Sequence, residues 1–419
     1  MLKTRLNLCI SRRSGVCFRL AGNHKIPVKP SFPLKESHLW RPFMFNRKST
    51  RTKFVSAFLL FFGIQPALAQ TANQVKQTSP ILLGTSGGNV HDASKAFCCS
   101  GTLGSLVTKN GVQYILSNNH VLADADTATV GDAISQPGLV DVGCNASATQ
   151  TVAKFSQAIP LNTANVDAAL AQIVAREVDT SGAILEIGNP ASTTAPDDST
   201  AVSRGVAKSG RTTGLTCAAI ASVNTNVKVQ YQRGCGKGKK FTILYLNQVL
   251  INSSSFSAGG DSGSLIVTSD TVQPIALLFA GSSTTTIGNR ISDVTSALGV
   301  SFVGPATASP TFTCPAPAAS AVAPAGARAA VSPSSFARAV AAKERHADHL
   351  MLEDSVLGVG VGVSSEDPSE AVVLIYLEEG RSHSPLPADL NGVRTEVVRT
   401  DAFRAFGWNE PQQLGCSVK

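Results

Sequence analysis

The sequence predicts a mainly β protein, and the spacing of its apolar residues is the main reason. Between about residues 80 and 303, short alternating runs are separated by Gly, Asn, Asp and Ser. Such runs are typical of an all-β barrel or sandwich. The 35 glycines and an aromatic content of only 6% also favour a turn-rich β protein over a helical bundle. At 419 residues the chain should hold two or three domains, and its 43% hydrophobic residues can supply their cores.

Residues 1–69 have the features of a leader with a secretory signal peptide. The apolar run 54–64 follows several basic residues and precedes small residues that predict cleavage after Ala69. The run would rise only about 16 Å as a helix, roughly half of a bilayer core, so no stable membrane anchor is expected. Met44, just before this signal, is the expected true start. The prediction is therefore a secreted or periplasmic protein.

The net charge argues against a nucleic-acid partner once the leader is set apart. The formal charge is +8, but residues 1–69 hold thirteen Lys and Arg and a single acid. Their net charge of +12 leaves −4 for residues 70–419. A basic excess confined to the leader predicts neither nucleic-acid binding nor attraction to a membrane surface.

Seven cysteines lie beyond the leader: Cys98, Cys99, Cys144, Cys217, Cys235, Cys314 and Cys416. Disulfides form in oxidising compartments, so an exported protein is expected to pair its cysteines. The chain has no CxxC pair and no histidines clustered with cysteines, which argues against zinc. An odd number leaves at least one thiol free or paired between chains. The sequence alone does not choose among the possible pairings.

The last part of the chain is expected to hold a linker and a smaller domain. Residues 304–333 are rich in Pro, Ala and Ser, as in a semi-rigid linker. In residues 334–419, helical spacing over 334–352 precedes strand-like alternation over 355–363, 371–379 and 392–400. This pattern predicts a small α+β domain, whose role the sequence leaves open.

Three motifs carry the chemistry, and their order along the chain supports a serine hydrolase. His120 lies in SNNHVLA, Asp167 opens the run VDAALAQI, and Ser262 lies in the glycine-rich SAGGDSGSLIV. A serine hydroxyl needs a base to accept its proton and a carboxylate to orient that base. Asp132 and Asp141 also lie between the histidine and the serine, but both have turn-like settings. We therefore predict a catalytic triad of His120, Asp167 and Ser262.

The glycines around Ser262 suit a second requirement of acyl transfer. Backbone N–H groups must approach the oxyanion that develops on the substrate, and glycine allows both the unusual conformation and the close approach. Gly259, Gly260 and Gly263 flank the serine. We predict that the N–H groups of Gly260 and Ser262 form the oxyanion hole.

In these motifs the sequence resembles the chymotrypsin-fold (trypsin-like) serine peptidases. GGDSGS matches their nucleophile loop, SNNHVL is similar to the histidine segment of HtrA-type members, and VDAAL is similar to their aspartate strand. A fourth segment, KSGRTTGLTCAAI (208–220), resembles the start of the second barrel in secreted bacterial members such as α-lytic protease. The resemblance covers about residues 80–303. It implies two six-stranded antiparallel β-barrels ahead of the linker.

The resemblance assigns roles to residues near the triad. Asp261 occupies the position of a buried aspartate that needs a cationic partner, and Lys208 stands where the bacterial motif would supply one. Ala207 replaces the usual cysteine partner of the position matched by Cys217. The resemblance therefore implies that Cys217 pairs with Cys235 across a β-hairpin.

The resemblance also indicates how a substrate would bind. The strand edge Ala280, Gly281 and Ser282 would pair with an extended peptide, although Ala280 replaces a serine that usually supports the catalytic aspartate. Phe256, six residues before Ser262, replaces the acid that selects Arg and Lys in trypsin-like members and would fill part of the substrate pocket. No Asp or Glu lies between residues 251 and 260, so a buried substrate cation would lack a partner. We expect cleavage after small or medium apolar residues.

Together these features predict an exported serine endopeptidase that hydrolyses peptide bonds through an acyl-enzyme. The main alternative is a catalytically silent binding or scaffold protein with the same fold. An α/β-hydrolase esterase would need G-x-S-x-G and the order Ser–Asp–His, which this chain lacks. No motif implies a metal or an organic cofactor. The expected partner is a protein or peptide substrate, and the oligomeric state is left open.

Overall fold

The computed structural model describes residues 70–405 except 95–96, 234, 236–237 and 315–330. The predicted signal peptide, its start at Met44 and the cleavage site after Ala69 lie outside these residues, as does Cys416. Contacts divide the chain into Met1–Pro66 and Ala67–Lys419, so all described residues belong to the second unit. No helix in this described part is long and apolar enough to cross a membrane.

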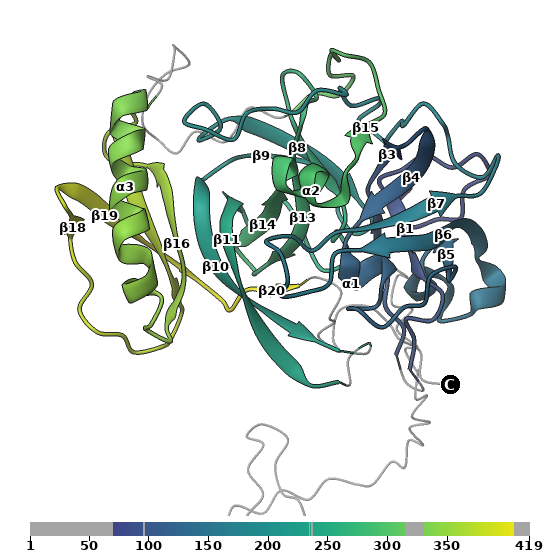
Figure 1. Cartoon of the computed structure of the whole chain (residues 1–419), viewed down its shortest axis with the longest axis horizontal. Coiled ribbons are helices and arrows are strands. Elements are labelled where there is room, and N and C mark those ends of the chain that lie inside the picture. The colour runs from purple at the N-terminus through teal and green to yellow at the C-terminus, as the bar shows by residue number, and fades with distance from the viewer. Residues whose placement is uncertain (1–69, 95–96, 234, 236–237, 315–330, 406–419) are drawn as a thin grey trace, which may run out of the picture. The chain divides into compact units, whose positions relative to one another are not determined.

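The predicted mainly β fold is confirmed, and the first sheet contains eight antiparallel strands in the order β15–β3–β4–β7–β6–β5–β1–β2 (Figure 1). Its strands are β1 (Thr85–Asn89), β2 (Gly101–Leu103), β3 (Ser105–Lys109), β4 (Val112–Ser117), β5 (Ala133–Gln136), β6 (Gln150–Ala158), β7 (Ala169–Ile173) and β15 (Ser301–Phe302). Its short helices are α1 (Asn119–Leu122), η1 (Leu139–Val142) and η2 (Ala146–Ala148).

The sequence of the first sheet explains its turns and its core. Asn110 and Gly111 both have positive φ and join β3 to β4 as a two-residue turn, whose twist matches that of the strands. Leu106, Ile115 and Leu170 come from three neighbouring strands and share one buried apolar cluster. Burial of this apolar surface is the main stabilising contribution.

The second sheet contains twelve strands, all of them later in the sequence than β7. Its path is β18–β19–β17–β16–β10–β11–β14–β13–β12–β8–β9, and β20 pairs with β10 and β13. The strands are β8 (Gly205–Gly210), β9 (Gly214–Ala219), β10 (Ser222–Gln232), β11 (Lys240–Asn252), β12 (Leu265–Thr268), β13 (Pro274–Gly281), β14 (Thr285–Arg290), β16 (Val356–Val363), β17 (Ala371–Glu378), β18 (Asp389–Leu390), β19 (Val393–Thr400) and β20 (Arg404–Ala405). Helix α2 (Ile291–Leu298) follows β14, and α3 (Pro333–Leu350) precedes β16.

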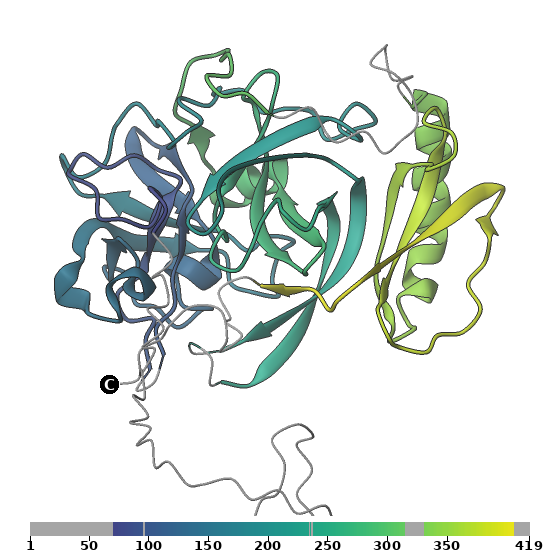
Figure 2. The same ribbon diagram turned by 180° about the vertical axis from the view of Figure 1, so that it is seen from behind.

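The arrangement agrees with two β-barrels and a small α+β unit, but the strand counts exceed the predicted six and six. The first sheet curls, and part of the second closes into a five-stranded barrel with extra strands (Figure 2). The second sheet is larger than expected because β16 pairs with β10. In this pairing Val361 of β16 lies opposite Val223 of β10. The C-terminal strands therefore continue the second sheet.

Glycine makes this pairing possible at one position. A Cβ at Gly360 on β16 would lie 2.1 Å from Oγ1 of Thr225, far inside van der Waals contact. Helix α3 adds a polar contact, because the buried Nζ of Lys343 donates to Oδ1 of Asn226 at 2.8 Å. The helix begins at a Ser332 cap, whose hydroxyl accepts from the Ser335 N–H at 3.1 Å.

Within the described residues, three disulfides are present: Cys98–Cys144, Cys99–Cys235 and Cys217–Cys314. The predicted Cys217–Cys235 bond is wrong. Cys235 follows the far end of β10, and a strand of 11 residues rises about 33 Å between its ends. That length separates Cys235 from β9, which carries Cys217. The hairpin strand that pairs with β9 is β8.

The first part of the predicted linker 304–333 is fixed to the barrel. The Thr311 hydroxyl donates to the carbonyl oxygen of Ile187 at 3.0 Å, and Cys314 forms the disulfide with Cys217. Residues 315–330 lie outside the described part of the chain. The linker boundaries thus stay a prediction, and its early residues are attached by covalent and polar contacts.

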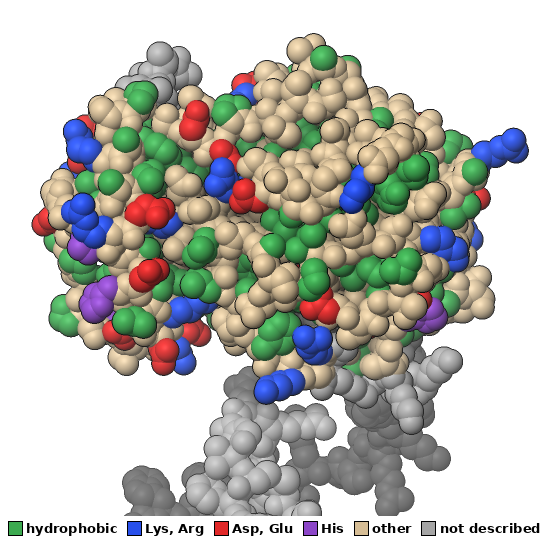
Figure 3. All heavy atoms as spheres, in the orientation of Figure 1, with side chains coloured by type: hydrophobic (Ala, Val, Ile, Leu, Met, Phe, Trp, Pro, Cys, Tyr) green, Lys and Arg blue, Asp and Glu red, His purple; other side chains and the backbone are tan. Residues whose placement is uncertain are grey.

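Charged side chains on the face in Figure 3 are dispersed and of both signs. Lys and Arg lie among Asp and Glu, with uncharged surface between them. This face therefore carries no large patch of a single charge sign.

Candidate active site

The first sheet brings His120 and Asp167 together. His120 lies on α1 directly after β4, and Asp167 lies just before β7. The two strands are antiparallel neighbours, with Ser117 opposite Ala169. The residues that leave β4 and enter β7 must therefore meet at one end of the sheet.

The contact between these two side chains is short and buried. Nδ1 of His120 lies 2.6 Å from Oδ2 of Asp167, and both side chains are fully buried. The His120 N–H donates to Oδ1 of the same carboxylate at 3.2 Å. Asn118 Nδ2 donates to the Asp167 carbonyl oxygen at 2.7 Å, which fixes the backbone. A carboxylate so placed holds the imidazole with Nε2 directed away from it.

Two residues from the second sheet hold Asp167, one at its carboxylate and one at its backbone, and sequence reasoning missed both. The Tyr231 hydroxyl donates to Oδ2 of Asp167 at 2.8 Å, and Oδ1 of Asn289 accepts from the Asp167 N–H at 2.8 Å. Burial, with the nearby Asp167 charge, raises the pKa of Tyr231 well above its usual value, so this phenol keeps its proton. Tyr231 supplies the hydroxyl that Ala280 lacks. Its position on a hairpin outside every recognised motif gave no signal in the sequence.

Ser262 lies in the loop between β11 and β12, with its backbone tied to both sheets. Its carbonyl oxygen accepts from the Thr102 N–H at 2.8 Å, and the next N–H, of Gly263, donates to the Leu278 carbonyl oxygen at 2.8 Å. A Cβ on Gly263 would lie 2.1 Å from Oγ of Ser117, so only glycine fits there. These contacts hold the loop against the end of β4, where α1 begins.

The reactive atoms of the predicted triad are buried and unpaired. Ser262 is 0% exposed and His120 is 3% exposed. Neither Oγ of Ser262 nor Nε2 of His120 has a hydrogen-bond partner in the described part of the chain, so the two are not bonded to each other. Catalytic hydrogen bonds are often long without substrate and tighten when it binds. A buried hydroxyl and ring nitrogen without partners are costly, which is common at functional sites.

The N–H groups predicted to form the oxyanion hole belong to Gly260 and Ser262. Gly260 has φ +99°, and a Cβ there would lie 2.5 Å from Oγ1 of Thr212. Within the described residues, the N–H groups of Gly260 and Ser262 donate to no protein acceptor. Both groups are therefore free to bind an oxyanion.

Lys208 lies beside Asp261, as the resemblance implied. Their charged atoms are 3.6 Å apart, and both side chains are fully buried. Asp261 also accepts from the N–H groups of Thr212 at 2.8 Å and Ala258 at 2.9 Å. Burial lowers the pKa of Lys208, and the charge of Asp261 opposes that shift. The carboxylate thus ties the nucleophile loop to β8 and to the turn after it.

The two other candidate aspartates have different partners. Asp141 forms a buried two-pronged ion pair with Arg211, whose Nε and Nη2 lie 2.8 and 2.6 Å from its oxygens. Asp132 lies in a turn, where its Oδ2 accepts from the Thr129 N–H at 2.9 Å. Asp167 is the one that contacts His120.

The predicted substrate-binding residues fall into two groups. Ala280 and Gly281 end β13, whose Leu278 is bonded to the residue after Ser262, and Ser282 follows. Phe256 is fully buried in an apolar cluster with Ile251 and Ile266, and its contribution to substrate binding stays a prediction.

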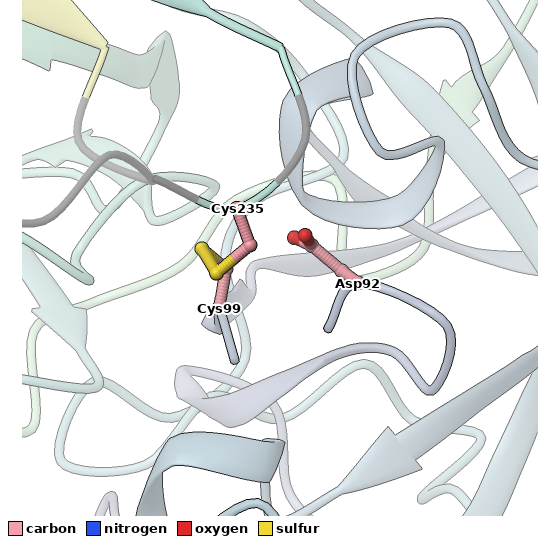
Figure 4. Close-up of side chains that lie close together, drawn as sticks. All are labelled: Asp92, Cys99 and Cys235. Carbon is pink, nitrogen blue, oxygen red and sulfur yellow. A yellow bond between two sulfur atoms is a disulfide. The ribbon is translucent and has the colours of Figure 1, made fainter. Parts of the chain in front are cut away.

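One further group could be considered for metal binding. Asp92, Cys99 and Cys235 have ligand atoms within 4.8 Å of one another (Figure 4). The two sulfurs are joined in a disulfide, so neither is a thiolate. One carboxylate without further ligands does not form a zinc or calcium site. A cavity of about 690 Å³ lies away from these groups, near His346, His349 and Leu386 of the C-terminal part.

No family model and no curated protein matches this chain. Among solved structures it is similar to a glutamic acid-specific serine protease that uses a novel histidine triad in substrate binding, with 20% identity, a TM-score of 0.38, and coverage of 53% of this chain and 100% of that chain. It is also similar to Thermobifida fusca Protease A (16% identity, TM-score 0.35, 54% and 98% covered). A third similar structure is that of Nocardiopsis protease, with 15% identity, a TM-score of 0.35, and coverage of 53% of this chain and 98% of that chain. At these identities the chain is similar to chymotrypsin-fold bacterial serine proteases in its fold alone.

Proposed function

We propose that this protein is an exported serine endopeptidase. The observation that carries the proposal is the buried 2.6 Å contact between Nδ1 of His120 and Oδ2 of Asp167, at the end of β4 against which the loop of the buried Ser262 is held. A carboxylate that fixes an imidazole, with a serine nearby, is the arrangement that activates a hydroxyl for acyl transfer. Three disulfides support a role outside the cytoplasm.

The residues divide the reaction as follows. Oγ of Ser262 attacks the substrate carbonyl carbon while Nε2 of His120 takes its proton, and Asp167 stabilises the imidazolium. The N–H groups of Gly260 and Ser262 bind the oxyanion. The peptide C–N bond then breaks, and the leaving amine takes the proton from His120. Water repeats the sequence and releases the acid from Ser262.

A catalytically silent binding protein is the second candidate. The absence of a hydrogen bond between Ser262 Oγ and His120 Nε2 favours it. Two free oxyanion donors and an unpartnered nucleophile argue for the enzyme, because a protein without catalysis gains nothing from these costly features. Turnover decides between the two candidates.

The test measures hydrolysis of a peptide anilide ending in Ala by the chain 70–419, its Ser262→Ala and His120→Ala variants, and a Ser255→Ala control in the same loop. Each triad substitution should lower kcat on the order of a million-fold, and the double variant should be no worse. Ser255→Ala should match the wild type, because that side chain is exposed. Covalent labelling by a fluorophosphonate should be lost with Ser262. A tenth of the activity left in Ser262→Ala would refute the mechanism.

A further inference from the structure

The strand edge proposed to bind substrate is already paired with the chain's own C-terminal segment. Strand β20 is antiparallel to β13, with Ala405 opposite Ala280 and Arg404 opposite Gly281. On its other side, β20 pairs with β10, and the Gln230 N–H donates to the Phe403 carbonyl oxygen at 2.9 Å. Figures 1 and 2 show this yellow strand leaving the C-terminal sheet and reaching β10.

The direction of β20 is that of a chain entering the reaction site. Along β13, Leu278 is bonded to Gly263 beside the nucleophile, and Ala280 and Gly281 lie progressively further along the strand. Because β20 is antiparallel, it runs toward the nucleophile loop. Within β20, Ala405 therefore lies opposite the β13 residue that is closer in sequence to Leu278, and the chain direction leads toward the nucleophile loop.

The side chains of the segment are bound in an alternating pattern. Phe403 and Ala405 are each 1% exposed, whereas Arg404 between them is exposed. The two buried residues belong to one apolar cluster with Phe279, Ala280 and Tyr231. Alternate burial along an added strand is the way an extended peptide is recognised.

Polar contacts hold the residues just before β20. The Thr400 hydroxyl lies 2.5 Å from that of Ser282 and 3.0 Å from that of Thr284. Ser283 contacts the Asp401 carboxylate. Ser282 ends the predicted substrate-binding edge, and Ser283 and Thr284 belong to the turn that follows it. The segment is thus bound at both its polar and its apolar positions.

We propose that residues 400–405 are an intramolecular, substrate-like ligand that keeps the protease inhibited in the intact chain. This inference rests on the proposed function. A tethered ligand has an effective concentration in the millimolar range, which an external peptide must overcome. The segment follows directly on the C-terminal α+β unit, which is joined to β10 through β16.

The test compares Phe403→Asp with a Val397→Asp control in the full chain 70–419. A buried carboxylate at 403 should expel the segment, whereas Val397 is 46% exposed on β19 and should tolerate the change. For a site that is free one tenth of the time, KM falls about tenfold in Phe403→Asp with kcat unchanged. Val397→Asp should match the wild type.

The outcomes separate this inference from the proposed function. Equal KM in wild type and Phe403→Asp, with both active and Ser262-dependent, would overturn the inhibition and leave the protease. No Ser262-dependent turnover in the wild type and in Phe403→Asp, with both folded by circular dichroism, would overturn the protease itself.

A peptide added in trans covers the case in which Phe403→Asp fails to fold. VRTDAFRA, the sequence of residues 398–405, should inhibit the wild type competitively and raise KM without lowering kcat. VRTDADRA, with Asp in place of the aromatic residue, should inhibit at least tenfold more weakly. Equal inhibition by the two peptides, or inhibition that lowers kcat alone, would refute binding of this segment at the substrate edge.

Discussion

The Tyr231 hydroxyl donates a 2.8 Å hydrogen bond to Oδ2 of Asp167, the same oxygen that lies 2.6 Å from Nδ1 of His120. A carboxylate oxygen has lone pairs for both contacts. The Tyr231 hydroxyl also lies 2.8 Å from the Tyr245 hydroxyl, and this buried hydrogen bond fixes its orientation. A hairpin of the second sheet thus orients a carboxylate of the first.

Tyr231→Phe should lower kcat about ten- to a hundredfold with little change in KM. Hydrogen bonds to charged groups contribute about 1.5–3 kcal/mol, and this one acts on the orienting carboxylate and not on the substrate. Tyr376→Phe is the control, because that hydroxyl is buried beside Ser222 away from the triad. An unchanged kcat would exclude a positioning role.

Lys208→Met should destabilise the fold by about 3–5 kcal/mol, since it leaves the Asp261 carboxylate buried without its cation. The double variant Lys208→Met/Asp261→Asn should recover part of that loss. Urea unfolding of the two variants and the wild type measures the difference.

The matched control for this pair is Arg204→Ala. Arg204 pairs with a largely exposed Asp270, and exposed pairs contribute about 1 kcal/mol or less. Equal losses in Lys208→Met and Arg204→Ala would contradict the special weight given to the buried pair.

The sequence predicted the features that depend on local residue patterns and on the order of motifs. These are the mainly β fold and the three motifs that contain His120, Asp167 and Ser262. It missed Tyr231 and Asn289, because their contacts to Asp167 arise from packing between sheets. The alternation of apolar residues within one strand likewise does not determine which strand it pairs with. The pairing of β16 with β10 and of β20 with β13 needs the tertiary fold.

Non-reducing peptide mapping should find the pairs Cys98–Cys144, Cys99–Cys235 and Cys217–Cys314. The sequence prediction failed here, because two cysteines 18 positions apart are separated by a long strand. The Cys99–Cys235 bond spans 136 residues, which the chain-entropy model values at about 5 kcal/mol. Replacing this pair with Ala should therefore lower Tm more than replacing an exposed serine pair. A peptide that links Cys98 to Cys235 would contradict the assignment.

Asp92→Asn should stabilise the protein relative to wild type, increasingly as pH rises from 4 to 8. Burial, with the neighbouring Asp124 carboxyl, raises the pKa of Asp92 well above its usual value of 3.8. Above 3.8 the folded state therefore binds a proton that the unfolded state releases, so stability falls with rising pH up to the folded pKa. Asn lacks this charge. The Tm difference between variant and wild type, measured across this range, should grow.

The control for this effect is Asp198→Asn. Hydrogen bonds from Thr200 lower the pKa of Asp198, so its charged form is favoured in the folded state and its loss should not stabilise the protein at high pH. A Tm difference for Asp92→Asn that stays constant between pH 4 and 8 would show that Asp92 titrates normally.

A peptide library should show cleavage after small apolar residues, with Ala, Val and Leu above Arg and Lys. The loop before Ser262 offers no acid, and the Ser257 and Thr286 hydroxyls, 2.5 Å apart, bond to each other beside it. An unpaired buried cation costs several kcal/mol.

The same library should favour an aromatic residue two positions before the small one, with any residue between them, if the bound segment is a template for substrates. Phe403 and Ala405 are the buried positions of β20, and Arg404 between them is exposed. The wild type and Phe403→Asp should share this profile, since the substitution releases the bound segment but leaves the residues of the binding edge unchanged. The profile is read by mass spectrometry of the cleaved peptides, with Ser262→Ala as the blank. A library led by Arg or Lys at the cleaved position would overturn the neutral character assigned to the site, and indifference two positions earlier would remove the template.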